Sequence, residues 1–152
     1  MSYQEKIRID APTERVWAVL VDVERWPEMT ASMSRVQRLD EGGFGTGSTV
    51  RIEQPRLLPL IWRVAAFEEG RAFTWTARSA GVTVVAGHYV SPSDDGSATN
   101  VTLTIRQSGF LAPLVRLLTS KLTRRYLRME STGLKRVSES GTGCRAEPDT
   151  RR

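Results

Sequence analysis

The sequence predicts an α+β fold: a curved, seven-stranded antiparallel sheet around a long C-terminal helix, with two short helices after the first strand. Apolar residues alternate with a period of two through much of residues 34–107, and short turns separate the alternating segments. A helical pattern over residues 113–137 follows them. Strands joined by short links favour antiparallel pairing, because a parallel pair needs a long crossover connection. The 152 residues leave room for one domain with a substantial core.

The first elements are a strand and two short helices. Alternation over residues 3–9 predicts the strand. A helix with an apolar face is predicted after Pro12, because proline suits the first turn of a helix. A second short helix is predicted over residues 22–27. We expect it to stop at Pro27, because the residue before a proline disfavours the helical conformation.

Six further strands are predicted after these helices. They span residues 34–39, 48–54, 60–67, 72–77, 82–90 and 98–107. The loop over residues 54–60 contains three leucines and two prolines. This loop is either a lid at the mouth of a pocket or a segment packed locally over the end of the long helix.

The last predicted element is the long helix over residues 113–137. Projected at 100° per residue, one of its faces carries Val115, Leu118, Leu122, Tyr126, Met129, Gly133 and Val137. Glycine weakens a helix, so Gly133 indicates close approach of another backbone. Residues 139–152 show no periodicity and are predicted to be a disordered tail, which leaves residues 1–138 as the domain.

The positive charge is concentrated in the long helix. The net charge is +5, and residues 116–136 contain seven basic residues against one acid, Glu130. The rest of the chain is close to neutral, which argues against a nucleic-acid interface built by the whole domain. The basic flank of the helix is either a solvated surface or a site of peripheral contact with an anionic membrane.

The remaining composition favours a cytoplasmic protein. No apolar run reaches the roughly 18 residues of a membrane span, and the N-terminus is charged where a signal peptide would be apolar. The only cysteine, Cys144, excludes a disulfide framework and a thiolate metal cluster. A single histidine, His88, without organised acids predicts no metal site.

Several segments match the motifs of a known superfamily. They are residues 9–12, 16–17, 20, 22–27, 47–48, 62–64, 73–75, 88–90 and 130–135. On these segments the chain resembles the START-related (SRPBCC) superfamily and, within it, the polyketide cyclase/dehydrase-like group, over roughly residues 3–138. The resemblance implies a helix-grip fold with a cavity between the concave face of the sheet and the long helix. It does not select one activity, because this architecture hosts carriers, cyclases, hydrolases and receptors.

Alternation and helical projection assign the residues that would line such a cavity. They are Val50, Ile52, Trp62, Val64, Phe73, Trp75, Val84, Ala86, His88, Leu103, Ile105, Leu118, Leu122, Tyr126 and Met129. This wall is apolar and aromatic with few polar points, as small-molecule pockets usually are. His88 is either a pocket imidazole that binds a ligand or moves a proton, or a buried strand residue satisfied by a neighbour.

Three functions follow as hypotheses. The first is binding or carriage of a small hydrophobic molecule, such as a lipid, isoprenoid or polyketide, without a cofactor. The second is a polyketide cyclase, aromatase or dehydratase that uses His88, with Tyr126 or an arginine as polar partner. The third is a membrane-surface or protein-interaction module that works through the basic flank of the long helix.

Overall fold

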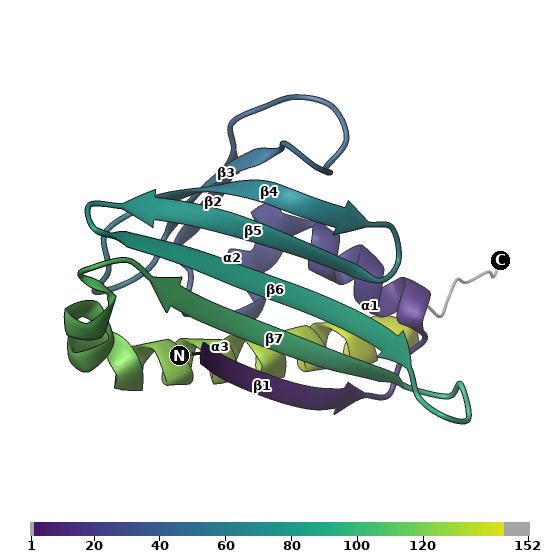
Figure 1. Ribbon diagram of the computed structural model, residues 1–152. Helices are drawn as coiled ribbons and strands as arrows, with labels where there is room; N and C mark the ends of the chain where they lie inside the picture. Colours follow the sequence, from purple (N-terminus) through teal and green to yellow (C-terminus); the bar gives the residue numbers. More distant parts are fainter. Residues whose placement is uncertain (1, 145–152) are drawn as a thin grey trace, which may run out of the picture.

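The computed structural model describes residues 2–144, and the side chains of residues 2–140. It confirms the predicted α+β architecture (Figure 1). The strands are β1 (Ser2–Ile9), β2 (Arg35–Arg38), β3 (Thr49–Glu53), β4 (Leu60–Glu68), β5 (Ala72–Ser79), β6 (Val82–Pro92) and β7 (Thr99–Ser108). The helices are α1 (Thr13–Val21), the 3₁₀ turn η1 (Val23–Arg25), α2 (Trp26–Met29) and α3 (Ala112–Cys144).

The seven strands form one antiparallel sheet in the order β1-β7-β6-β5-β4-β3-β2. The sheet is curved, and the helices lie on one side of it, behind the strands in the view of Figure 1. β6 pairs with β5 and β7 along most of its length, which places His88 opposite Phe73 on one side and Leu103 on the other. The inner face at the centre of the sheet therefore carries this histidine.

The second short helix differs from its prediction. The chain makes the 3₁₀ turn η1 and then continues through Pro27 into α2, which ends at Met29. Pro27 lies in the first turn of α2, where its missing N–H would have had no partner within the helix. The expectation that Pro27 stops the helix is wrong for this reason.

Helix α3 also extends beyond its predicted end at residue 137. It runs to Cys144, so the first six residues of the predicted tail are helical, and residues 145–152 lie outside the described part of the chain. Tertiary contacts accompany the extension. The side chain of Ser138 is fully buried, and Glu139 accepts hydrogen bonds from the backbone N–H of Asp10 at 2.8 Å and from Lys135 Nζ at 2.6 Å.

The C-terminal half of α3 is anchored to α2 by a close backbone approach. A Cβ atom on Gly133 would overlap the carbonyl oxygen of Met29, so only glycine fits this position. The same oxygen accepts a hydrogen bond from Arg136 Nη2 at 2.9 Å. The close approach inferred from Gly133 is confirmed.

The buried face of α3 is rotated from the predicted one. The side chains that enter the core belong to Leu127, Glu130, Ser131, Leu134 and Ser138. Leu118, which was expected in the wall, is 74% exposed. None of residues 113–126 is buried, so the N-terminal half of α3 packs loosely on the sheet.

Aromatic rings fill the interior between the sheet and α1. Phe44, Phe67 and Phe73 pack on one another with ring centroids 5.2 to 6.4 Å apart. Trp17 closes the cluster, and its Nε1 donates a hydrogen bond to the Glu69 carboxylate at 3.0 Å. This part of the interior is therefore filled by aromatic side chains.

Candidate functional site

A small cavity lies between α3 and the inner face of the sheet. Its volume is about 70 Å³, room for a few water molecules. It is lined by Met33, Ile52, Gln54, Trp62, Trp75, Ala86, Gly87, His88, Leu103, Thr104, Ile105, Thr123, Tyr126, Leu127 and Glu130. The wall is mainly apolar, and the ionisable groups on it are His88, Tyr126 and Glu130.

Eight of the residues predicted for the wall do line this cavity. They are Ile52, Trp62, Trp75, Ala86, His88, Leu103, Ile105 and Tyr126. Val50, Val64 and Phe73 are buried, and Val84 is half-buried, but they lie outside the cavity lining. On the helix, Leu118, Leu122 and Met129 do not reach it, because α3 is rotated from the predicted orientation.

His88 is buried in a cage of aromatic rings. Its ring stacks on Phe73 with 4.3 Å between centroids and 13° between planes, packs edge-to-face with Trp75, and lies at a tilt of 50° to Trp26. Burial lowers the pKa of His88 to about 4, although the contact of its Nδ1 with the Phe73 carbonyl opposes this. Nδ1 lies 3.3 Å from that oxygen, which can only accept, so Nδ1 carries the proton and Nε2 keeps a free lone pair.

Glu130 is the second ionisable group of the cavity. Glu130 is 7% exposed, and burial is the only cause of its shifted pKa, with no hydrogen-bond or charge partner among the described residues. Burial without a partner raises the pKa of the carboxyl to about 8. At neutral pH the cavity therefore offers a protonated carboxyl that can donate a hydrogen bond and an imidazole that can accept one.

The sequence prediction missed Glu130 as a site residue. A single acid among basic residues on a helix is normally a surface residue. The sequence does contain one signal that Glu130 is buried. Leu127, Glu130 and Leu134 follow at intervals of three and four, so the acid lies on the same face of the helix as two leucines. Gln54 and Thr123 were missed in a similar way, because polar side chains on a loop and on a helix gave no apolar pattern.

The β3–β4 loop and α3 meet at the mouth of the cavity. The Tyr126 hydroxyl donates a hydrogen bond to the carbonyl oxygen of Pro55 at 2.5 Å, and the neighbouring Gln54 lines the cavity. The Gln54 amide also donates to the Ser32 carbonyl at 3.1 Å. The leucine-containing loop thus contacts the helix beside the cavity, while Leu58 itself points into solvent.

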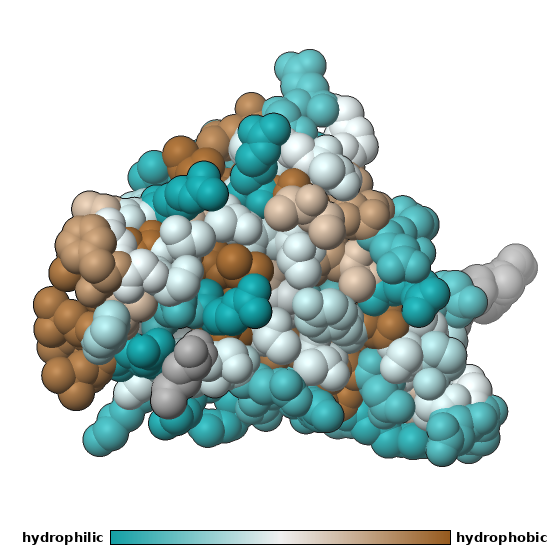
Figure 2. Space-filling model, viewed as in Figure 1, coloured by the Kyte–Doolittle hydropathy of each residue, from teal (hydrophilic) through white to brown (hydrophobic). Residues whose placement is uncertain are grey.

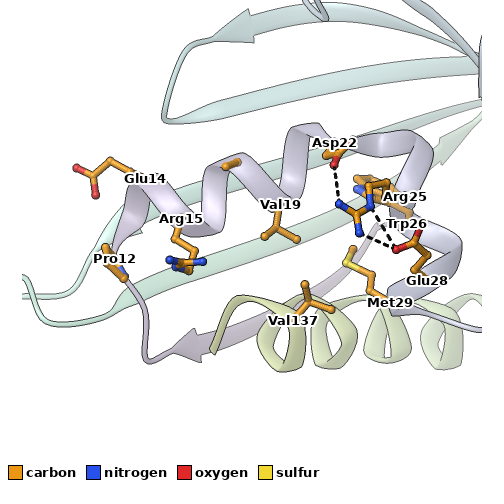
Figure 3. A pocket seen from close by; sticks show the side chains of 11 residues that line it. Pro12, Glu14, Arg15, Val19, Asp22, Arg25, Trp26, Glu28, Met29 and Val137 are labelled. Atoms are coloured by element: carbon orange, nitrogen blue, oxygen red, sulfur yellow. Dashed lines mark hydrogen bonds and ion pairs between the residues drawn. The ribbon is translucent and has the colours of Figure 1, made fainter. Parts of the chain in front are cut away.

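A larger hollow, about 640 Å³, lies on the outer surface between α1, α2 and α3 (Figure 3). Val19, Met29 and Val137 face one another across its floor. Three of the charged groups on its rim pair with each other, since Arg25 lies 3.0 Å from Glu28 and 4.0 Å from Asp22. This groove is open to solvent and its rim carries both signs of charge, so we place the candidate site in the inner cavity.

Among the residues that the structure describes, no group of three or more histidine, cysteine, aspartate or glutamate side chains is arranged to hold a metal ion. No helix there combines the length and the hydropathy required to cross a membrane.

Comparison with known proteins relates this geometry to a family. A family model described as polyketide cyclase / dehydrase and lipid transport matches residues 1–139. No curated protein matches the chain in sequence. Among solved structures, the Zhui aromatase/cyclase from a Streptomyces species is similar, with a TM-score of 0.77, 16% identity and coverage of 93% of this chain and 95% of that one.

Two other structures have the same fold. A START superfamily protein from Mycobacterium smegmatis gives a TM-score of 0.70 at 15% identity, and the match covers 89% of this chain and 97% of that one. A hypothetical protein from Helicobacter pylori gives a TM-score of 0.79 at 13% identity, with 91% and 88% covered. At such low identities these likenesses establish the helix-grip fold.

Proposed function

We propose that this chain, which belongs to the polyketide cyclase/dehydrase and lipid transport family, binds a small hydrophobic molecule between α3 and the sheet. The observation that carries the proposal is the unpartnered Glu130 carboxyl, buried in a cavity whose other walls are mainly apolar and aromatic. A buried polar group without a partner costs free energy, and a bound ligand with a hydroxyl or carbonyl group would remove that cost.

In this conformation the cavity is too small for such a ligand. Its 70 Å³ compares with about 300–1,000 Å³ for pockets that hold drug-sized molecules. The loosely packed residues 113–126 of α3 supply the missing space, because they leave the sheet without removing a buried side chain from the core. We therefore propose that ligand entry moves this half of α3 outward while the half after Leu127 stays in place.

Native mass spectrometry of freshly purified protein, followed by organic extraction, tests the proposal directly. A retained compound with an apolar body and at least one oxygen function is the expected result. For protein that is purified empty, a titration with a fluorescent fatty-acid probe replaces the extraction, and binding at micromolar concentration is expected. A chain that retains nothing and binds no apolar probe would contradict the proposal.

A matched pair of variants locates the bound molecule. Thr123→Phe places a ring in the cavity, whereas Thr119→Phe places the same ring one helical turn earlier, outside the cavity lining. Both threonines are half-buried on the same helix, so the two variants carry similar structural costs. We expect Thr123→Phe to weaken probe binding at least about tenfold, as the loss of one well-packed contact does, and Thr119→Phe to leave it unchanged.

Catalysis is the second candidate function, and one observation favours it. Burial holds His88 neutral and Glu130 protonated at the same pH, which makes one a base and the other an acid. A pair of this kind suits proton removal next to a carbonyl and protonation of a leaving hydroxyl, the steps of cyclisation and dehydration of a polyketide chain. His88 with Glu130 replaces the earlier hypothesis of His88 with Tyr126, whose hydroxyl is already engaged with the Pro55 carbonyl.

The two candidates are separated by a turnover assay on a reactive polyketide analogue. An enzyme would convert it, and Glu130→Gln would abolish conversion while the affinity for a non-reactive probe stays within a few-fold. A carrier would bind the analogue and release it unchanged. Circular dichroism would show whether Glu130→Gln is folded. If it is not, His88→Gln is assayed in its place, and loss of turnover in that variant is expected of an enzyme.

A further inference from the structure

Four large apolar side chains are exposed at the start of α3. Phe110 is 83% exposed and Leu117 is 77% exposed, and Leu114 and Leu118 lie beside them in the first two turns of the helix. Figure 2 shows hydrophobic side chains gathered at this end of the molecule, around the β7–α3 junction. We call Phe110, Leu114, Leu117 and Leu118 the apolar tip. Four large apolar side chains exposed together at one end of the molecule indicate an interaction site for an apolar surface.

Basic residues continue the same helix face beyond the apolar tip. At 100° per residue, Lys121, Arg125 and Arg128 project in the direction of the three leucines. Their side chains are exposed, and none of them forms an ion pair with a described residue. The sequence contains no acid from residue 108 to residue 129. The exposed face of α3 is thus apolar at its start, and from residue 121 to residue 128 it carries positive charge without an acid.

We propose that the apolar tip inserts into the surface of an anionic membrane, with Lys121, Arg125 and Arg128 at the level of the lipid headgroups. The spacing along the helix fits this arrangement. Arg125 follows Leu118 by seven residues, about 10 Å at the rise of an α-helix. If the helix enters the bilayer with its N-terminal end first, Arg125 stays about 10 Å nearer the water than Leu118, which brings the basic residues to the headgroup region.

Charge complementarity selects a lipid surface over a second copy of this chain. Two copies joined through the apolar tip would bring two sets of unpaired cations together without intervening acids. An anionic bilayer offers an apolar interior behind a negative surface, in the order that the helix presents. The inserted segment is also the loosely packed half of α3, so membrane contact would act on the part of the helix that covers the cavity.

Vesicle flotation tests the proposal with full-length protein. Phosphatidylcholine vesicles with phosphatidylglycerol are compared with vesicles of phosphatidylcholine alone. Binding to the anionic vesicles, weakened by added salt, is expected. Leu117→Ser with Leu118→Ser should reduce the partition coefficient about a hundredfold, because two exposed leucines lose their burial in lipid. Arg125→Gln with Arg128→Gln should reduce it about thirtyfold.

Each double variant has a matched control on another face. Leu39→Ser with Ile61→Ser removes two exposed apolar side chains, and Lys6→Gln with Arg71→Gln removes the same net charge. Both controls should bind vesicles like the unmodified chain. Failure of the unmodified chain to bind anionic vesicles would overturn the proposal, as would binding that survives loss of both leucines. A dimer in size-exclusion chromatography that Leu117→Ser with Leu118→Ser dissociates, with no vesicle binding, would also overturn it in favour of a second copy.

Discussion

The ring of His88 lies parallel to that of Phe73, 4.3 Å away, and its Nδ1 reaches the carbonyl oxygen of the same residue. One neighbour thus supplies both the stacking partner and the hydrogen-bond acceptor of the buried imidazole. The contact fixes the tautomer, since a carbonyl cannot donate. Nε2 remains as the acceptor of the ring, and its protonation would place an uncompensated charge in an aromatic cage.

The pH dependence of stability should therefore change when His88 is replaced by phenylalanine. The pKa of His88 in the folded chain, about 4, lies below its ordinary value of 6.5. The unfolded chain binds the extra proton between these values, so acidification from pH 6.5 to 4 disfavours the fold by about 3 kcal/mol through this residue. Urea unfolding at several pH values should show that His88→Phe gains relative stability over this window. Parallel curves for the two proteins would show that the imidazole is not buried as described.

Replacement of Glu130 by glutamine should have the opposite pH signature. Its folded-state pKa of about 8 is raised above the ordinary 4.5. Its contribution is therefore fully present below pH 4.5 and is lost as the pH rises through 8, by about 3 kcal/mol between pH 4.5 and 7. Relative to Glu130→Gln, the unmodified chain should lose stability as the pH rises in the same urea titrations. A difference that does not vary with pH would mean that the carboxyl has a charged or hydrated partner in solution.

Gly133→Ala should destabilise the fold far more than its helix propensity suggests. Alanine is the better helix former, but its Cβ would overlap the Met29 carbonyl oxygen, so α2 and α3 would have to separate. We expect a loss of about 3 kcal/mol in the free energy of unfolding. Gly43→Ala is the matched control, because no atom lies within 4 Å of the added Cβ there. Equal unfolding free energies for the two variants would contradict the close helix contact.

Tyr126→Phe should release the N-terminal half of α3 without unfolding the chain. It deletes the hydrogen bond from the tyrosine hydroxyl to the Pro55 carbonyl, worth about 1 kcal/mol, and keeps the ring in place. Hydrogen exchange measured by mass spectrometry should accelerate in residues 113–126 by about fivefold. Exchange around Gly133 should not change, and acceleration there would show that the helix opens as a whole.

The strands were predictable from sequence because alternation reports burial directly. Val50, Trp62 and Trp75 point inward as predicted, and the six later strands lie within a few residues of their predicted bounds. Helix α3 was harder to orient. Leu118 follows the spacing of a core residue but lies in solvent, and a projection cannot tell an exposed apolar face from a buried one.

The polar part of the candidate site was only half predictable. His88 stood out as the single histidine on an inward-facing strand position. Glu130 did not, because an ionisable residue on a basic helix is expected at the surface unless the rotation of the helix is known. The cavity volume was not predictable either, since the cavity lies between the sheet and α3 and its size depends on how the helix is rotated against the sheet.

Helix α3 is held most firmly in its C-terminal half, by Gly133 against α2 and by Leu134 in the core, whereas no side chain of residues 113–126 is buried. If residues 113–126 open to admit a ligand, that opening is a local fluctuation with its own free energy, separate from that of global unfolding. Thermal resistance and ligand residence time would then be set by different residues. Substitutions near Gly133 would move the melting temperature and leave the dissociation rate of a ligand unchanged, whereas substitutions within residues 113–126 would do the reverse.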